Sequence, residues 1–526
     1  MPAAPPTLSR RDLARWALLG APAAAFVAAC GGSDPAAAPA TTALPQATRP
    51  TTRPTTMPTT VPAATRPATT IPATTLAPAT TVAAVPGLPW WLRGNFAPVG
   101  REIDAAELPV TGALPPALRG LYVRNGSNPA AGTSPHWFFG DGMVHGVRLA
   151  DGRATAYTNR YVRTDLYTAG LGFGEGAPGG AANQSNVSCI WHAGRLLTSG
   201  EVGFPYELDP ATLDTVGVFD FAGALTSAFT AHPKLDPATG RLHSFGYGFT
   251  PPYLTYHVIE PDGTLAHASV VDIPRSTMIH DFAITDRDAV FWDLPVVFDL
   301  DAAVRFIEDP DAAAFPYRWA PEAGARVGVM PLGGGAVQWF ELDPCYVFHG
   351  VNAYRDGTDV EVDVCALSSM FAPGQVLGGD ASLQRWTLDT LTGKASVRVL
   401  GEHTGDLPSR NPRLLGRPYR YAYLVATREA ADTVDFGGVV KLDVKTGAAD
   451  TWDPGPGFHG GEWLFVPADD DTAEDAGYLL GYVHDDATDT TQLVVLDAAA
   501  VRAGPIARVG LPQRVPYGFH AAWVPD

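Results

Sequence analysis

Four histidines share one kind of setting, and their side chains could bind a metal ion together. Each lies beside apolar, β-type residues at the end of a strand-like run, far from the others along the chain. They are His232, His280, His349 and His520. Neutral imidazole binds iron, copper, nickel and zinc, so the residue types alone do not choose the metal. We predict that the fold brings these four rings onto one ion.

The stretch around His280 indicates how one of these rings is presented. Residues 278–295 contain two β-type runs separated by a turn at residues 286–288, which predicts a β-hairpin with His280 at its mouth. The neighbouring acid, Asp281, is expected to point to the opposite face, because successive side chains of a strand alternate. His280 is therefore a predicted ligand, and Asp281 is not.

Short strands are the elements that must position these histidines. From residue 88 onward, β-type runs alternate with Asp-Gly, Asp-Pro and Thr-Gly turns, which predicts an all-β body. The body is too long for one ordinary sandwich. A β-propeller of roughly six to eight blades fits, at roughly 40 to 50 residues per blade. Helical insertions are predicted at residues 301–315 and 367–371.

The composition excludes one broad class of partner. The chain of 526 residues is 46% hydrophobic and 17% charged, as expected for a globular protein. Its 36 Lys and Arg residues against 55 Asp and Glu residues give a formal charge of −19. Such a charge repels phosphates, so no nucleic-acid partner is expected.

The N-terminal residues are predicted to lie outside the folded body. Residues 1–30 resemble a twin-arginine export signal that ends in a bacterial lipobox at Cys30. Lipidation there would anchor the exported protein to the outer face of the bacterial cell membrane; an uncleaved N-terminal helix is the alternative. Residues 31–87 are rich in Thr, Pro and Ala and are predicted to form a disordered tether. Residues 88–526 form the predicted folded domain.

Three further cysteines are Cys189, Cys345 and Cys365. An odd number outside the cytoplasm leaves at least one thiol unpaired or bonded to another chain. Cys345 and Cys365 flank a predicted hairpin that turns at residues 356–357, so a cross-strand disulfide and buried free thiols both remain open.

Longer motifs resemble those of the carotenoid cleavage oxygenases. The resemblance covers residues 88–526 and rests on Leu-Tyr-Val-Arg-Asn-Gly-Ser-Asn-Pro at 121–129, on His-Trp-Phe-Phe-Gly-Asp-Gly-Met-Val-His at 136–145, and on the order of the four histidine motifs. It implies a seven-bladed β-propeller with a helical and loop cap over the iron-bearing face. It also implies one Fe(II) per chain. The implied ligands are His232, His280, His349 and His520.

The resemblance further implies carboxylates that orient the ligand rings. Glu201 is expected to accept a hydrogen bond from His280, and Glu462 one from His520, since the second nitrogen of a ligand histidine usually donates to such an acceptor. His232 is expected to have no carboxylate partner.

The third orienting position departs from the family. Where its members usually have Glu-Phe-Pro, this chain has Asp406 followed by Leu407 and Pro408. Because aspartate is one methylene shorter than glutamate, its hydrogen bond to His349 is expected to be longer or mediated by water. Loss of such a partner commonly costs 10- to 100-fold in metal affinity or activity.

The activity implied by the resemblance is Fe(II)-dependent cleavage of a conjugated C=C bond by O₂, which gives two carbonyl products. The expected partners are O₂ and an apolar polyene, a carotenoid or apocarotenoid. Stilbene-cleaving members tend to have a lysine immediately before the glutamate matched by Glu201, and here that residue is Gly200. The alternatives are a stilbene-type dioxygenase of phenolic alkenes and a ligand-binding propeller lipoprotein without catalysis, which Asp406 alone favours. A calcium hydrolase would need oxygen ligands.

The stretch between Val296 and Phe315 mixes large apolar residues with acids. It resembles the place where family members present an apolar patch to a membrane at the mouth of the substrate tunnel. A buried cap helix would give the same pattern, so both interpretations stay open.

Overall fold

The computed structural model describes residues 87–172, 180, 183–308, 315–428, 430, 433–468 and 472–526. The predicted export signal, including Cys30, lies outside the described residues. The predicted tether, residues 31–87, also lies outside the described residues except for Gly87.

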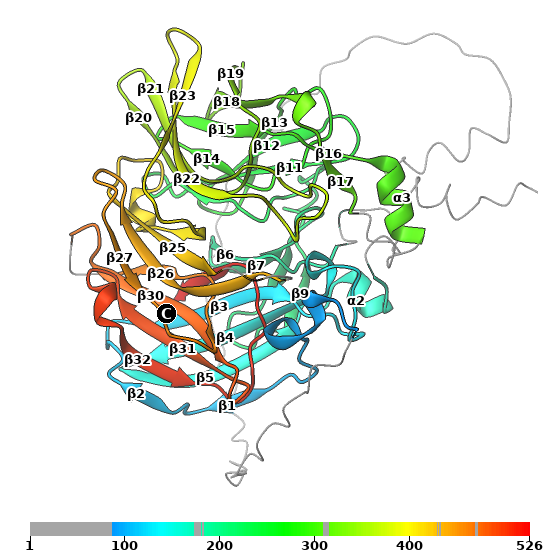
Figure 1. Ribbon diagram of the computed structural model, residues 1–526. Helices are drawn as coiled ribbons and strands as arrows, with labels where there is room; N and C mark the ends of the chain where they lie inside the picture. Colours follow the sequence, from blue (N-terminus) through cyan, green and yellow to red (C-terminus); the bar gives the residue numbers. More distant parts are fainter. Residues whose placement is uncertain are drawn as a thin grey trace, which may run out of the picture. The chain divides into compact units, whose positions relative to one another are not determined.

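Seven antiparallel sheets form the blades of a β-propeller in the described part of the chain (Figure 1). Blade 1 contains β1 (Asp104–Ala106), β5 (Arg153–Tyr161), β4 (Gly142–Ala150), β3 (Gly120–Ser127) and β33 (Ala521–Pro525). Blade 2 contains β6 (Ser188–His192), β7 (Arg195–Ser199), β8 (Tyr206–Leu208) and β9 (Thr215–Val218). Blade 3 contains β10 (Lys234–Leu235), β11 (Leu242–Tyr247), β12 (Leu254–Ile259) and β13 (Leu265–Val270).

The other four blades follow in chain order. Blade 4 contains β14 (Phe282–Ile284), β15 (Asp288–Asp293), β18 (Ala325–Pro331) and β19 (Gln338–Leu342). Blade 5 contains β20 (Tyr346–Asp356), β21 (Asp359–Leu367), β22 (Ala381–Asp389) and β23 (Lys394–Val399). Blade 6 contains β24 (Asp406–Ser409), β25 (Tyr421–Arg428), β26 (Asp435–Asp443) and β27 (Ala449–Trp452). Blade 7 contains β2 (Val110–Gly112), β32 (Pro505–Gly510), β31 (Thr490–Asp497), β30 (Gly477–Asp485), β28 (Phe458–His459) and β29 (Leu464–Pro467). The predicted seven-bladed propeller is confirmed.

Two exchanged strands close the ring of blades. The C-terminal strand β33 pairs with β3 in blade 1, and the N-terminal strand β2 pairs with β32 in blade 7. Each end of the domain therefore completes a sheet made mainly from the other end. Such pairing covers backbone groups that would otherwise form open sheet edges.

Burial along the strands explains why the blades stack. The strand β15 is buried at all six positions, whereas β13 at the edge of its sheet alternates between half-buried and exposed residues. Middle strands are covered on both faces by neighbouring blades. Trp292 of blade 4 and Trp386 of blade 5 meet in this way, with ring centroids 6.4 Å apart. Full burial of one large apolar side chain contributes about 1.5–3 kcal/mol.

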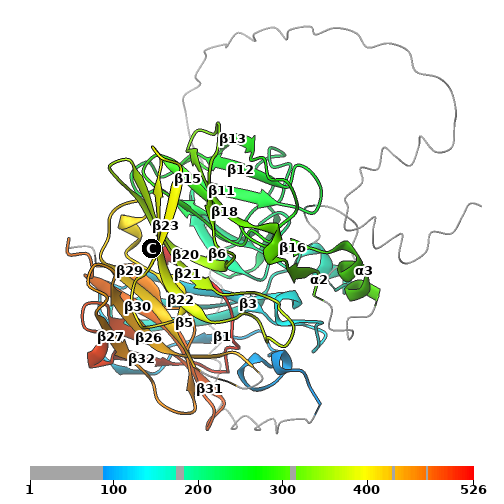
Figure 2. The same cartoon turned by 45° about the horizontal axis from the view of Figure 1, so that its top comes forward.

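Helices are a minor part of the fold. The α-helices in the described residues are α2 (Asp165–Ala169) and α3 (Leu300–Glu308). The 3-10 helices there are η3 (Trp90–Leu92), η4 (Gly94–Phe96), η5 (Trp137–Phe139), η7 (Pro321–Ala323), η8 (Pro412–Leu414) and η9 (Val501–Ala503). Helix α3 and the hairpin of β16 (Val296–Phe298) and β17 (Tyr317–Trp319) are inserted between β15 and β18 of blade 4, and lie to one side of its strands (Figure 2).

The second predicted helical insertion is wrong. In residues 367–371, β21 ends at Leu367 and Met370 forms a bridge with Gly378. The side chain of Ser368 accepts a hydrogen bond from the backbone N–H of Asp380, and that of Ser369 accepts one from Gln375. Serine side chains that bond locally in this way compete with helix formation.

The described part of the insertion between Val296 and Phe315 supports the cap-helix interpretation over a membrane patch. Val296, Val304 and Phe306 are buried, and Phe315 is half-buried. Residues 309–314 lie outside the described residues. No helix in the described ranges has the length and apolar character needed to cross a membrane.

Of the two alternatives left open for the cysteines, the structure has the free thiols, since Cys189, Cys345 and Cys365 are all unpaired. The predicted hairpin is present in β20 and β21, and Asp356 pairs with Asp359 at its turn. At its open end Tyr346 pairs with Leu367, so Cys345 lies beyond the position of Cys365. Burial raises the pKa of Cys345 to about 12, which keeps this thiol protonated.

Candidate metal centre

The four predicted histidines come from four different blades. His232 lies two residues before β10, His280 two residues before β14, and His520 directly before β33. His349 lies inside β20. Each of these strands is at the edge of its sheet, and β14 and β33 contact the first strands of neighbouring blades. The strand-end setting expected from the sequence is present for three of the four histidines, while His349 lies within its strand, and all four rings converge on one place.

The four rings form a single compact group. One nitrogen from each lies within 4.8 Å of the others. Nε2 of His232 is 2.9 Å from Nε2 of His280. Two ligands at right angles on a metal, with bonds of about 2.1 Å, would be about 3 Å apart. Nε2 of His349 is buried without a hydrogen-bond partner in the described structure. A shared metal ion fits these nitrogens.

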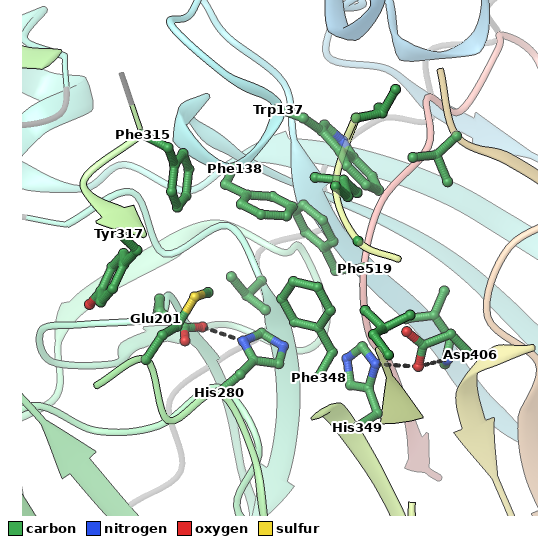
Figure 3. Close-up of a pocket in the computed structure, with 18 of the residues that line it drawn as sticks. Trp137, Phe138, Glu201, His280, Phe315, Tyr317, Phe348, His349, Asp406 and Phe519 are labelled. Carbon is green, nitrogen blue, oxygen red and sulfur yellow. Dashed lines mark hydrogen bonds and ion pairs between the residues drawn. The ribbon is translucent and has the colours of Figure 1, made fainter. Parts of the chain in front are cut away.

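Three carboxylates determine which nitrogen faces the group in three of the four rings, and Figure 3 shows two of these pairs, Glu201 with His280 and Asp406 with His349. Nδ1 of His280 donates to Glu201 at 2.8 Å, and Nδ1 of His520 donates to Glu462 at 2.8 Å. An ionised carboxylate only accepts hydrogen bonds, so Nδ1 carries the proton and Nε2 keeps its lone pair. This is the tautomer that a metal ligand requires.

The third carboxylate corrects one prediction. Nδ1 of His349 donates directly to Oδ1 of Asp406 at 2.7 Å, so the expectation of a longer or water-mediated contact is wrong. The local backbone conformation explains how the shorter side chain of Asp406 contacts His349 directly. The pairing of β24 shifts register between Asp406 and Ser409, and Leu407 takes a left-handed conformation with φ of 48°. The N–H of Leu407 also donates to Asp406 Oδ1 at 2.8 Å.

Every blade contributes one residue to this arrangement. The histidines come from blades 1, 3, 4 and 5. Glu201 lies between β7 and β8 of blade 2, Asp406 begins β24 of blade 6, and Glu462 lies between β28 and β29 of blade 7. As predicted from the family, His232 has no carboxylate partner among the described residues.

Burial makes these rings suitable as neutral ligands. It lowers the pKa of His232 well below its usual value, and the neighbouring histidines lower it further. It also lowers the pKa of His520, against the opposing effect of Glu462. For His349, burial lowers the pKa, but the charge and hydrogen bond of Asp406 outweigh it and the net shift is upward. Metal binding requires an unprotonated ring nitrogen.

A buried tyrosine steadies one of the carboxylates. The hydroxyl of Tyr247, at the end of β11, donates to Oε1 of Glu201 at 2.7 Å. Burial and the charge of Glu201 raise the pKa of Tyr247 well above its usual value, so the hydroxyl remains a donor. The other oxygen of Glu201, Oε2, accepts the hydrogen bond of His280. The sequence showed no periodic or spacing signal for this contact.

Asp281 does not belong to the four-histidine group. Its carboxylate lies 2.6 Å from Nζ of Lys234 and accepts from the N–H of Gly350 at 2.9 Å. Around Gly350 the pairing of β20 is irregular, and a Cβ at this position would come within 2.8 Å of Trp292. A bulge of this kind re-aims neighbouring side chains, here that of His349.

An apolar cavity of about 670 Å³ opens beside the histidines (Figure 3). Phe348 lies between His280 and His349, and Phe138 and Phe519 lie above them. Two of these aromatic residues could have been found in the sequence, because Phe348 and Phe519 each directly precede a predicted ligand histidine. A cavity of about 300–1,000 Å³ lined mainly by apolar side chains is typical of a small-molecule site.

The two longer sequence motifs have structural roles. Asn125 donates to the carbonyls of Ser185 and Ser188 and so ties β3 to the start of blade 2. His136 caps η5 by accepting from the N–H of Phe138. His145 bonds to the hydroxyl of Tyr157 within blade 1. Neither histidine belongs to the four-histidine group.

The fold and the site together define a class: a seven-bladed propeller with four histidines from separate blades beside an apolar cavity. A sequence model of the family described as retinal pigment epithelial membrane protein matches residues 96–525. The carotenoid cleavage oxygenase of Mycobacterium tuberculosis is 40% identical over 502 residues, which cover 85% of this chain and 99% of that protein.

Solved structures of two oxygenases superpose on this chain over most of its length. Lignostilbene dioxygenase of Pseudomonas brassicacearum superposes with a TM-score of 0.75 at 29% identity, covering 84% of this chain and 99% of that one. Cobalt-substituted apocarotenoid oxygenase of Synechocystis superposes with a TM-score of 0.73 at 26% identity, covering 83% and 98%. The chain belongs to the carotenoid cleavage oxygenase family.

Proposed function

We propose that this protein is an Fe(II)-dependent dioxygenase that cleaves a conjugated C=C bond of a carotenoid or apocarotenoid and forms two carbonyl products. One observation carries the proposal. Four imidazole nitrogens lie within 4.8 Å of one another beside an apolar cavity of about 670 Å³. A relative 40% identical to this chain is named a carotenoid cleavage oxygenase.

The ligand set supports a bound Fe(II). Four neutral nitrogens leave the full +2 charge on the metal and do not fill an octahedron. When bound, Fe(II) would supply the activation of O₂. His232, His280, His349 and His520 would hold it, while Glu201, Asp406 and Glu462 keep three of these rings in the ligand tautomer.

The aromatic side chains of the cavity would bind the polyene. Phe138, Phe348 and Phe519 offer flat apolar faces close to the histidines. Packing against them would hold the conjugated chain in place and exclude water from the reacting bond. No organic cofactor enters this scheme.

A stilbene-type phenolic alkene is the second candidate substrate, favoured by the similarity to a lignostilbene dioxygenase. Gly200 argues against a stilbene-type substrate. Stilbene-cleaving members tend to have a lysine at this position, and glycine supplies no cation next to Glu201 that could bind a phenol. The non-catalytic alternative has lost its one favourable feature, because Asp406 bonds to His349 directly at 2.7 Å.

The test is to load the purified protein with Fe(II) under anaerobic conditions, add O₂, and supply carotenoids, apocarotenals and stilbenes in parallel. We expect about one iron per chain by metal analysis and paired carbonyl products from polyenes by mass spectrometry. The same protein loaded with Zn(II), which has no redox chemistry, is the control and should form none. Bound iron without product from any compound would contradict the proposal.

We also propose that the protein is exported and anchored to the outer face of the bacterial cell membrane through a lipid on Cys30. The support is the sequence of residues 1–30 alone. Export of a folded chain would suit a metalloprotein that receives its ion beforehand. We expect the wild type in the membrane fraction and Cys30→Ala in the soluble fraction, measured by immunoblotting after cell fractionation. A Cys30→Ala protein that stays with the membranes would refute the anchor.

A further inference from the structure

Arg124 is a buried cation without an acid beside it. It lies in β3, within the motif at residues 121–129, and is only 3% exposed. Arginine is seldom buried this far unless an acid pairs with it. In the described part of the chain, however, its guanidinium forms no ion pair, and its buried Nε has no hydrogen-bond partner. A buried polar group of this kind calls for an explanation.

The contacts of this guanidinium lie in two segments that carry the metal site. Its Nη2 donates to the carbonyl of Pro516, four residues before His520. A Cβ atom at Gly518 would lie 2.8 Å from its Nε, and one at Gly461 would lie 3.4 Å from its Nη1. Gly518 is two residues before His520, and Gly461 directly precedes Glu462. The guanidinium therefore lies between the segment of a ligand histidine and the segment of the carboxylate that orients it.

Both of these segments lie outside regular strands. Glu462 lies between β28 and β29, and residues 511–520 connect β32 to β33. His349 and Asp406, by contrast, lie within β20 and β24. A ladder of backbone hydrogen bonds fixes the residues of a strand. Glu462 and His520 lack such a ladder, so a side chain in contact with both of their segments can fix one relative to the other.

An aromatic ring also holds the guanidinium in place. Its central carbon lies 4.9 Å from the centroid of the Tyr482 ring in β30 of blade 7. The hydroxyl of Tyr482 donates to the carbonyl of His145 at 3.0 Å, which fixes the ring. A desolvated guanidinium is attracted to the face of such a ring. Arg124 thus joins blade 1 to blade 7 next to the metal centre.

The charge of Arg124 also opposes that of Glu462. Burial raises the pKa of the Tyr122 hydroxyl, while Arg124 lowers it and Glu462 raises it. The pKa of the Cys189 thiol is likewise raised by burial and by Glu462, and lowered by Arg124. Both charges therefore act in one region of the interior, where Coulomb interactions are strong. The cation offsets part of the cost of burying the Glu462 carboxylate.

We propose that Arg124 is a positioning residue of the metal centre. It fixes the segments of His520 and Glu462 relative to each other, and its charge stabilises the Glu462 carboxylate. It acts on a bound metal only through this pair, since it does not belong to the group that could hold the ion. The proposal rests on the proposed metal site but not on the proposed cleavage reaction.

Binding of cobalt(II) tests this without requiring turnover. Titration of the metal-free protein with Co(II), followed by visible absorption, measures the Kd and reports the ligand geometry of the site. Arg124→Met keeps an unbranched side chain and removes the charge and the donors. We expect it to bind Co(II) roughly tenfold more weakly than the wild type, with a changed absorption spectrum.

Two further variants frame this result. Arg124→Lys keeps the charge but loses the planar fork, so its Kd should lie between those of the wild type and Arg124→Met. Arg148→Met is the matched control. Arg148 lies in β4 of the same blade and also donates to a proline carbonyl, that of Pro210 at 2.9 Å, but neither residue belongs to the metal site. Its replacement should leave the Kd and the spectrum unchanged.

Double-mutant cycles separate this local role from a general loss of stability. If Arg124 acts through Glu462, the losses from Arg124→Met and Glu462→Gln should overlap, so the double variant should bind clearly more tightly than the two separate losses predict. The cycle with Asp406→Asn, which acts on His349 instead, should be additive. Should Arg124→Met not fold, Arg124→Lys takes its place in both cycles with the same expected outcomes.

A wild-type Kd and spectrum in Arg124→Met would overturn the proposal. So would a cycle with Glu462→Gln that is as additive as the cycle with Asp406→Asn. A protein that meets these expectations with cobalt but cleaves no polyene when loaded with iron would leave the role of Arg124 standing and sink the proposed dioxygenase function alone.

Discussion

Replacing His280 with alanine is expected to give a folded protein that has lost its iron. The substitution removes one of four nitrogens in the group and leaves Glu201 without its partner. Loss of an outer partner alone commonly costs 10- to 100-fold in metal affinity, and loss of a ligand should cost more. Metal analysis after dialysis against Fe(II) measures the effect. The ring lies in a cavity wall, so its removal should disturb the core little.

The adjacent substitution Asp281→Asn should behave in the opposite way. Asp281 is 1% exposed, and its carboxylate pairs with Lys234 at 2.6 Å rather than with a histidine of the group. Breaking a buried ion pair destabilises by about 3–5 kcal/mol, because one charge is left without a partner. We expect iron binding close to wild type and a clearly lower melting temperature. If Asp281→Asn lost iron as completely as His280→Ala, the assignment of His280 rather than Asp281 would fail.

Replacing Asp406 with alanine is expected to weaken iron binding by roughly 10- to 100-fold, as for other outer partners of ligand histidines. The direct bond of 2.7 Å to His349 is the reason, since its loss frees the ring to rotate and to exchange tautomers. Competition with a chelator of known affinity would measure the change. Glu462→Ala should give a loss of similar size, because Glu462 holds His520 at 2.8 Å in the same way.

Asp406→Asn separates charge from geometry. Its amide oxygen can still accept from Nδ1 of His349, so we expect a loss of only a few-fold, smaller than for Asp406→Ala. The exposed Glu402, four residues earlier in the chain, supplies a matched control, and Glu402→Ala should bind iron as the wild type does. Wild-type affinity in Asp406→Ala would show that the shorter acid has no orienting role here.

The sequence alone was sufficient for the parts of this protein that local patterns encode. Turn residues between short β-type runs predicted the all-β body, and the strand-like settings of His232, His280, His349 and His520 suggested one group. The count of seven blades came only from the resemblance to the family. The alternation of side chains along a strand placed Asp281 on the opposite face from His280. These features depend on neighbours within a few residues, so they can be read without coordinates.

Only the tertiary structure decided how distant segments meet. Glu201 lies 79 residues from His280, and Asp406 lies 57 residues from His349. The direct contact between Asp406 and His349 depends on the left-handed backbone at Leu407 and on a register shift in β24. The residue type of position 406 reveals neither feature. The free thiols likewise follow from strand register and blade packing. Whether two distant side chains touch depends on where the ring of blades places their backbones. The spacing of the residues along the chain does not encode this.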